Sequence, residues 1–326
     1  MPRPRFNPKL ESSTPDTLPY LDDFLLFIRA NNYSPETAYN YERDLETFAH
    51  FLKKEMDLEF KSATKRTIEQ FKAYLNSSDR RTAKGSATMQ DLKSGSINRI
   101  LTSLRRYLQY LIDMDEEVPV VPGSIKLLRM EKKHKQVAEM EELKKLIEFP
   151  TKIEKEKLVA LRNRAMLETL FASGMRISEL INLKRAQLDK SGRIFIQGKG
   201  KKQRFIYLTD RAKKHIDNYL KERTDEYPYL FVATQGLNMK DKTKHISPNY
   251  LQMKIKQYRE ILGINVPTSA HSLRHGFATY LAESGANPAA IQILLGHESL
   301  DTTTRYVHAS DKYAEKTHKD FHPLKD

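Results

Sequence analysis

The sequence predicts a mainly α-helical protein of two domains with one small antiparallel β-sheet. Apolar residues recur at helical spacing in the first third of the chain, and two β-rich pentamers flank a glycine-rich turn in the second half. A stretch with prolines and a basic run separates these regions, which is typical of a linker. We therefore expect a helical domain over residues 1–116, a linker over 117–137 and a mixed α/β domain over 138–326. A chain of 326 residues is long enough for about two cores.

Helices are expected throughout the N-terminal domain. A Ser-Pro pair, which suits a helix cap and first turn, opens the segment 35–55, where apolar residues return every three or four positions. Shorter apolar helices are expected at 18–30 and 64–75. The polar segment 79–95, rich in Ser, Thr and Gly, indicates a loop.

The clearest helical pattern covers residues 96–114. Its apolar stripe consists of Ile97, Leu101, Leu104, Leu108 and Leu111. At 100° per residue, Arg99 and Arg106 lie about 180° to 200° from Ile97, so both face away from the stripe. They are either solvated surface charges or contacts to DNA phosphates and bases.

The second domain is expected to begin with helices at 140–148 and 154–173. Two pentamers, 193–197 and 204–208, are then rich in β-formers, and the segment between them contains two glycines. This arrangement predicts a β-hairpin, after which helices return.

Composition excludes several classes of chemistry. The chain has no cysteine, so disulfides, thiolate metal sites and cysteine nucleophiles are ruled out. No apolar run approaches the roughly 18 residues of a membrane-spanning helix, and no signal peptide is recognisable at the start. We therefore expect a cytoplasmic protein.

The charge distribution indicates a polyanionic partner. The net charge is +14, and the segments 61–110 and 181–220 each carry +8, whereas 11–60 carries −7. One basic block is often only a solvated face. Two blocks in separate domains favour a clamp around nucleic acid.

Four segments of the second domain carry chemically useful side chains. They are 173–180 (SGMRISEL) with Arg176, 198–202 (GKGKK) with Lys199, 271–275 (HSLRH) with His271 and Arg274, and 294–298 (LLGHE) with His297, followed nine residues later by Tyr306. Each taken singly has a structural explanation, such as a helix cap, a turn residue or a packed side chain. His271 and His275 have the spacing of a helical zinc pair, but Ser272 stands where zinc proteases have Glu, and we expect no metal site.

Taken together, the four segments resemble the tyrosine recombinase (phage integrase) family of DNA strand-exchange enzymes. That family has an Arg in a T/S-G-x-R-x-x-E-L segment, a Lys in a G-K-G hairpin, an H-x-x-R pair, an L-G-H segment and a Tyr about nine residues later. All are present here in order. Gly276 and Tyr207 depart from the usual Thr and Pro, outside the catalytic set. Residues 32–37 (NYSPET) are similar to the start of the family's helical core-binding domain.

The resemblance implies a role for each residue of the set. Arg176 and Arg274 clamp the phosphate, His271 is the partner of Arg274, and Tyr306 is the nucleophile. Lys199 is the hairpin lysine and His297 is the second histidine.

The chemistry of these side chains agrees with those roles. Two guanidiniums can hold the non-bridging phosphate oxygens without a metal ion. A phenol with a pKa of about 10 needs such a field and a base, for which His271 is suited. Lys199 can protonate the leaving 5′-oxygen, which gives the 5′-hydroxyl, and His297 can donate a hydrogen bond to the phosphate. Because a phosphotyrosine ester stores the bond, no ATP or other cofactor is expected.

Double-stranded DNA at a recombination site is the expected partner, with contacts from Arg99, Arg106, Lys201 and Arg204. Within the family the chain looks most like the Xer-type recombinases of chromosome dimer resolution. A mobile-element integrase or resolvase, a type IB topoisomerase-like enzyme, a non-catalytic DNA-binding protein and a metal-dependent nuclease are the alternatives. Residues 307–326 contain the apolar anchors Tyr313, Phe321 and Pro323. The resemblance implies that this tail packs on a neighbouring protomer in a tetramer on DNA, whereas a frayed terminus is the simpler reading.

Overall fold

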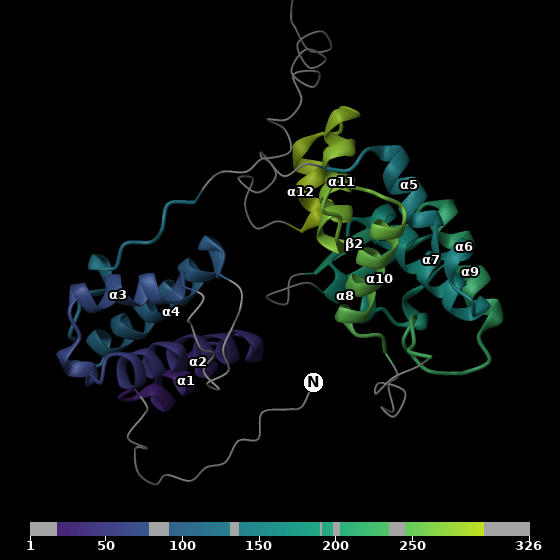
Figure 1. The fold of residues 1–326 in the computed structure, drawn as a ribbon. Coiled ribbons are helices and arrows are strands. Elements are labelled where there is room, and N and C mark those ends of the chain that lie inside the picture. Colours follow the sequence, from purple (N-terminus) through teal and green to yellow (C-terminus); the bar gives the residue numbers. More distant parts are fainter. Residues whose placement is uncertain are drawn as a thin grey trace, which may run out of the picture. The chain divides into compact units, whose positions relative to one another are not determined.

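The computed structural model describes residues 18–77, 91–130, 137–189, 191–197, 203–234 and 245–296. The chain divides into two compact units, with the division between Lys133 and His134. Figure 1 shows the N-terminal unit in purple and blue and the second unit in teal to yellow. Within the described ranges, every helix is too short or too polar to cross a lipid bilayer.

The N-terminal unit is built from helices at the predicted places. They are α1 (Leu21–Ala30), α2 (Pro35–His50), which continues into a π-helical turn (Phe51–Glu55), α3 (Lys65–Leu75) and α4 (Ser94–Asp113). Ser34 caps α2 by accepting a hydrogen bond from the Thr37 backbone N–H at 3.1 Å. The end of the predicted loop 79–95 differs from expectation, since α4 begins at Ser94; residues 78–90 lie outside the described part.

The core of this unit is apolar and rich in aromatic rings. All five residues of the predicted stripe on α4 are no more than 1% exposed. Phe71 of α3 meets Phe48 of α2 with ring centroids 4.9 Å apart, and Phe24 of α1 meets Tyr107 of α4 at 5.6 Å. Burial of these rings together with the surrounding aliphatic side chains stabilises the packing of the helices.

Part of the predicted linker belongs to this unit. Val120 and Ile125 are 4% and 2% exposed within the N-terminal core. The Asn98 side chain of α4 donates to the Leu128 carbonyl at 2.9 Å and accepts from the Leu128 N–H at 2.8 Å. Residues 118–128 therefore pack on the unit. The prolines and glycine of this segment favour turns, but its apolar side chains Val120 and Ile125 are buried in the N-terminal core.

The second unit surrounds one central helix. Its elements are α5 (Met140–Glu148), α6 (Pro150–Ile153), α7 (Lys157–Ser173), α8 (Ile177–Ile181), β1 (Arg193–Gln197), β2 (Gln203–Tyr207), α9 (Asp210–Glu222), α10 (Pro248–Ile261), α11 (Ala270–Glu283) and α12 (Pro288–Leu295). Helix α7 contacts α5, α6, α8, α9, α11 and β2 and is buried on most of its faces.

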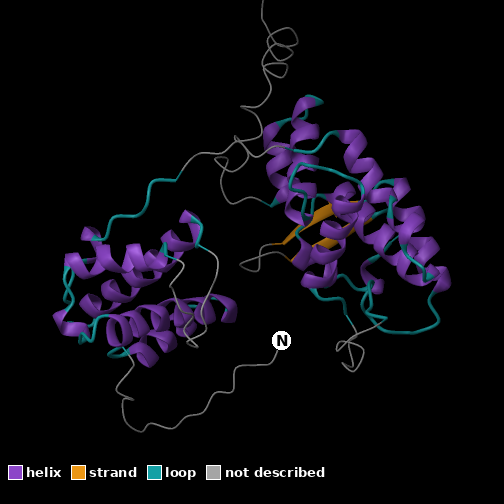
Figure 2. Cartoon of the chain, in the orientation of Figure 1, coloured by secondary structure: helices purple, strands orange, loops and turns teal. Residues whose placement is uncertain are grey.

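The predicted β-hairpin is present. Strands β1 and β2, orange in Figure 2, pair antiparallel with Phe195 opposite Phe205. One face is buried through Ile194, Ile196 and Ile206, while both phenylalanines are exposed on the other. This alternation is the period-2 pattern of a half-buried strand. The turn 198–202 lies outside the described residues.

The core of the second unit contains charged side chains as well as apolar ones. Arg162 is 2% exposed and donates to the Val232 carbonyl at 2.9 Å and the Tyr250 hydroxyl at 2.6 Å. The buried Arg223 donates to the Leu230 carbonyl at 2.8 Å. A guanidinium can be buried here because its donors are satisfied by backbone and side-chain oxygens.

Candidate active site

Arg176 is placed by a helix junction that requires glycine. Helix α7 ends at Gly174, whose φ is +60°, and a Cβ atom there would lie 2.3 Å from a ring carbon of Phe277. Both the left-handed backbone and the close approach of α11 therefore exclude a side chain. The chain turns at this point and places Arg176 as the N-cap of α8.

Glu179 orients the Arg176 side chain. The Arg176 backbone N–H donates to Glu179 Oε2 at 2.7 Å, and Arg176 Nη1 donates to Glu179 Oε1 at 3.0 Å. The Arg176 side chain remains 36% exposed, whereas Glu179 is 4% exposed. The arginine is thus anchored on a buried carboxylate and still reaches the surface.

Arg274 lies on α11 and is buried. It is 4% exposed and donates from Nη1 to the Gly174 carbonyl and from Nη2 to the Leu295 carbonyl, both at 2.7 Å. His271 is in the first turn of the same helix and is exposed. Ser269 caps this helix by accepting from the Ser272 N–H at 3.2 Å, which fixes where α11 begins.

Arginines from three elements meet at the C-terminal end of α12. Helix C-termini leave carbonyls without intrahelical partners and carry negative partial charge, so cationic donors are favourable there. The pairs are Arg204 Nε with Leu294 O at 3.0 Å, Arg274 Nη2 with Leu295 O at 2.7 Å and Arg176 Nη2 with Gly296 O at 3.4 Å.

This end of α12 therefore unites Arg176 and Arg274, which are far apart in the sequence. Two guanidiniums directed at one place can bind the non-bridging oxygens of a phosphate. A phosphate oxygen is a stronger acceptor than a carbonyl because it is charged, so it can take over donors that now serve backbone oxygens.

Glu179 was the residue whose role the sequence did not reveal. It accepts two hydrogen bonds from Arg204, Nη1 to Oε1 and Nη2 to Oε2, both at 2.8 Å. Burial alone raises the pKa of Glu179, but the hydrogen bonds and charges of Arg204 and Arg176 outweigh it and hold the pKa below its usual value. The available signal was its place three residues after Arg176, which is the capping-box spacing.

Arg204, which the sequence analysis expects to contact DNA, has partners within the protein. Its side chain is 8% exposed, and its guanidinium is bound to Glu179 and to the end of α12. A basic residue in a basic block suggested DNA contact, but β2 points this side chain inward.

The other two described candidates for DNA contact lie on α4 in the N-terminal unit. The Arg99 side chain is 51% exposed, and its Nη1 lies 2.5 Å from Oδ2 of the buried Asp44. Arg106 has its guanidinium carbon 5.7 Å from the centre of the Phe27 ring. Asp44 lies on α2 and Phe27 on α1, so both guanidinium groups contact helices of the same unit.

Four candidates, Lys199, Lys201, His297 and Tyr306, lie outside the described residues. Across the ranges that are described, no three His, Asp or Glu side chains form a group that could hold a metal ion. His275 Nδ1 lies 3.1 Å from the Thr279 hydroxyl, one helical turn along α11.

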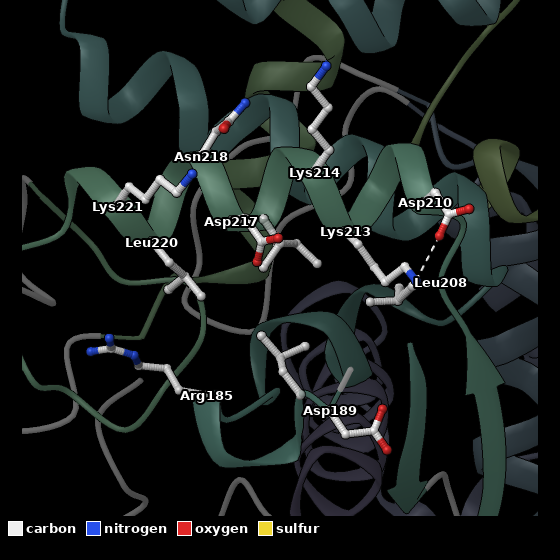
Figure 3. A pocket seen from close by; sticks show the side chains of 12 residues that line it. Arg185, Asp189, Leu208, Asp210, Lys213, Lys214, Asp217, Asn218, Leu220 and Lys221 are labelled. Carbon is white, nitrogen blue, oxygen red and sulfur yellow. Dashed lines mark ion pairs between the residues drawn. The ribbon is translucent and has the colours of Figure 1, made fainter. Parts of the chain in front are cut away.

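An open groove of about 760 Å³ lies elsewhere on the second unit. It runs between α9 and the segment 185–189, and it is lined by charged side chains of both signs (Figure 3). Lys213 and Asp210 form an ion pair of 2.7 Å along its wall. The three candidate catalytic residues in the described ranges, Arg176, His271 and Arg274, do not line this groove, so it is separate from the arginine site.

Two family models match the chain. The phage integrase family matches residues 136–313, and the phage integrase N-terminal SAM-like domain matches residues 21–114. The chain is 30% identical over 310 residues to Tyrosine recombinase XerC of Staphylococcus aureus (strain USA300), covering 93% of this chain and 96% of the relative. It is 29% identical over 299 residues to Tyrosine recombinase XerC of Staphylococcus haemolyticus (strain JCSC1435), covering 90% and 92%.

Solved structures share the fold. A XerH site-specific recombinase bound to its palindromic difH substrate has a TM-score of 0.68 at 23% identity, covering 92% of this chain and 83% of that one. A lambda integrase dimer bound to a core site has a TM-score of 0.66 at 16% identity, covering 87% and 95%. With a family model over more than half of its length and relatives at 30% identity over nearly all of it, the chain belongs to the phage integrase family of tyrosine recombinases.

Proposed function

We propose that this protein is a site-specific DNA recombinase of the Xer type that cuts and rejoins DNA through a 3′-phosphotyrosyl intermediate on Tyr306. The observation that carries the proposal is the convergence of Arg176 and Arg274 on the end of α12, each with guanidinium nitrogens bound to carbonyl oxygens. His297 is the next residue in the chain after Gly296.

In the proposed cleavage step the two arginines hold the non-bridging oxygens of the scissile phosphate. The Tyr306 oxygen attacks phosphorus, a phenolic P–O bond forms and the bond to the 5′-oxygen breaks. His271 takes the phenolic proton, and Lys199 supplies a proton to the leaving 5′-oxygen, which becomes a 5′-hydroxyl. His297 donates a hydrogen bond to the phosphate, whose charge grows in the transition state.

The reverse of this step rejoins DNA. A 5′-hydroxyl from another strand attacks the phosphotyrosine, so the number of phosphodiester bonds is conserved and no ATP is consumed. This is why a tyrosine ester on the protein is sufficient to store the bond energy between cutting and joining.

Relatives named Tyrosine recombinase XerC support a role in chromosome dimer resolution. DNA is present in the fold relatives, including the integrase of transposon Tn1549 in complex with a circular intermediate DNA, with a TM-score of 0.66 at 19% identity. We propose that the protein acts in the cytoplasm on double-stranded DNA as a tetramer of two dimers, joined through the tail 307–326. Both basic blocks, with Arg99, Arg106 and Lys201, would contact the DNA.

Replacing Tyr306 with Phe tests the nucleophile. Tyr306→Phe should bind DNA normally and form no covalent adduct, because only the attacking oxygen is removed. The measurement is trapping on nicked suicide substrates, with the adduct detected as a detergent-resistant complex. Tyr313→Phe is the matched control and should form the adduct. A covalent adduct that still forms in Tyr306→Phe would show that another residue is the nucleophile.

A further inference from the structure

The Arg204 guanidinium binds a backbone carbonyl and both oxygens of a carboxylate. It projects from β2, is 8% exposed and donates from Nε to the Leu294 carbonyl at 3.0 Å. Its two terminal nitrogens each donate at 2.8 Å to a different oxygen of Glu179. Such a bidentate pair fixes the plane of the carboxylate as well as its position, which a lysine ammonium cannot do.

The carboxylate that Arg204 fixes is the one that orients Arg176. Glu179 Oε1 accepts from both Arg204 Nη1 and Arg176 Nη1, and Oε2 accepts from both Arg204 Nη2 and the Arg176 backbone N–H. Rotation of the carboxylate would therefore move the Arg176 guanidinium. Arg204 and Arg176 are like charges that share one buried anion.

Arg204 also fits closely against the end of α12. Gly296 has a φ of +63°, and a Cβ atom there would lie 2.9 Å from Arg204 Cδ and 3.0 Å from Nη1. The glycine lets the helix end approach the guanidinium closely. Residues 294–296 accept hydrogen bonds from Arg176 and Arg274 as well as from Arg204, so Arg204 contacts the same helix end as the two candidate phosphate-binding arginines.

We propose that Arg204 is a positioning residue for strand cleavage: it fixes Glu179, and through it Arg176, and ties the end of α12 to the hairpin without contacting DNA. The inference rests on the proposed function. The Arg204 side chain is 8% exposed and both of its terminal nitrogens already donate to a buried carboxylate, whereas Arg176 is 36% exposed and reaches the surface.

The test compares Arg204→Lys with wild type in the full-length protein. Arg204→Lys keeps the charge and loses the two-pronged geometry, so we expect unchanged affinity for the DNA site but slower single-turnover cleavage of a nicked suicide substrate, by about 10- to 100-fold. Arg193→Lys is the matched control, because Arg193 lies on the partner strand of the same hairpin with its guanidinium over the exposed Phe205 ring. It should cleave like wild type.

Two further measurements separate positioning from a general loss of stability. Glu179→Gln and Arg204→Lys should be non-additive in cleavage rate, because both act through the same carboxylate. In Arg204→Met, the loss of a cation that lowers the pKa of Glu179 should move the acid limb of the cleavage rate to higher pH. Thermal melts taken in parallel report whether each variant is folded under the assay conditions.

A readout that does not need activity is the NMR signal of the Arg176 side-chain N–H, assigned by its loss in Arg176→Lys. This signal should shift in Arg204→Lys and stay in place in Arg193→Lys. Weaker DNA binding with normal cleavage in Arg204→Lys, multiplicative rates in the double variant, or an unmoved Arg176 signal would each overturn the positioning role. Absence of any covalent adduct from wild type would instead refute the proposed function, and the NMR comparison would still decide the role of Arg204.

Discussion

One buried carboxylate in each unit is paired with arginine, yet the two pKa values move in opposite directions. Asp44 in the N-terminal unit and Glu179 in the second unit are 3% and 4% exposed. Burial raises the pKa of Asp44, and the opposing effects of Ser103 and Arg99 do not compensate for it. The pKa of Glu179 is lowered in spite of its burial.

The difference lies in the number of donors and where they bind. Among described residues, Glu179 accepts four hydrogen bonds spread over both of its oxygens, all of them from two arginines. Asp44, in contrast, accepts from Arg99 at 2.5 Å and from the Ser103 hydroxyl at 2.7 Å, and both of these hydrogen bonds end on Oδ2. Burial disfavours the charged form of a carboxylate and raises its pKa, and the number of hydrogen-bond donors decides whether that effect is outweighed.

The largest effect is expected from Glu179→Gln. This change leaves Arg204 buried with no counter-charge, and breaking a buried pair in this way costs about 3 kcal/mol or more in the free energy of unfolding. Calorimetry of the full-length protein should show the second unit melting at a lower temperature. Glu141→Gln, which removes an exposed partner of Lys144 on α5, is the control and should melt like wild type.

Low pH should weaken the contribution of the Glu179 carboxylate to the free energy of unfolding. The folded pKa of Glu179 is below its ordinary 4.5, so the stabilisation is complete above that value and disappears as the pH falls through the folded pKa. The melting difference between wild type and Glu179→Gln should be constant from about pH 7 to about pH 5 and shrink in more acidic buffers. A difference that grows with acid would contradict the sign of the shift.

Asp44→Asn should have a smaller effect of the opposite sign. The raised folded pKa of Asp44 means that its charged form costs stability at neutral pH, and this cost is relieved as the pH falls through that pKa. The amide oxygen of Asn can occupy the Oδ2 position and accept from both Arg99 and Ser103. We expect the N-terminal unit to be stabilised at neutral pH by up to about 1 kcal/mol. Calorimetry at neutral pH would refute this if the N-terminal unit of Asp44→Asn melted at a lower temperature than that of wild type.

The smallest effect concerns DNA binding by α4. If Arg99 and Arg106 contact phosphates, each Ala variant should reduce the slope of log affinity against log salt by about one unit. Fluorescence anisotropy with the DNA site at several salt concentrations measures this slope. Arg29→Ala, on α1 of the same unit, is the control. An unchanged slope in the double variant would leave both arginines with internal roles, beside Asp44 and Phe27.

The N-terminal unit could be predicted well because its signals are local. The apolar stripe of α4 and the Ser-Pro start of α2 specify helix and buried face within a few turns. The segment 118–128 was assigned to the linker since its prolines and glycine suggest turns. Its packing depends on Asn98 of α4, about 30 residues earlier in the chain.

The second unit was less predictable because its core contains buried charged side chains as well as apolar ones. Arg162 and Arg204 have the sequence signature of surface residues, yet both are buried, since their donors meet oxygens from distant segments. Nothing local distinguishes such an arginine from one that contacts DNA. Arg176, His271 and Arg274 could be recognised as candidate catalytic residues because their motifs have the order and spacing of the family pattern.

The sequence by itself determined the helices, the hairpin, the family and the set of candidate catalytic residues, because these depend on periodicity, turn chemistry and motif spacing. Only the tertiary structure decided that the end of α12 brings Arg176 and Arg274 together and that Glu179 and Arg204 hold Arg176 in place. Hydrogen bonds between residues about 25 to 120 positions apart need the folded chain to bring their atoms within 3.5 Å.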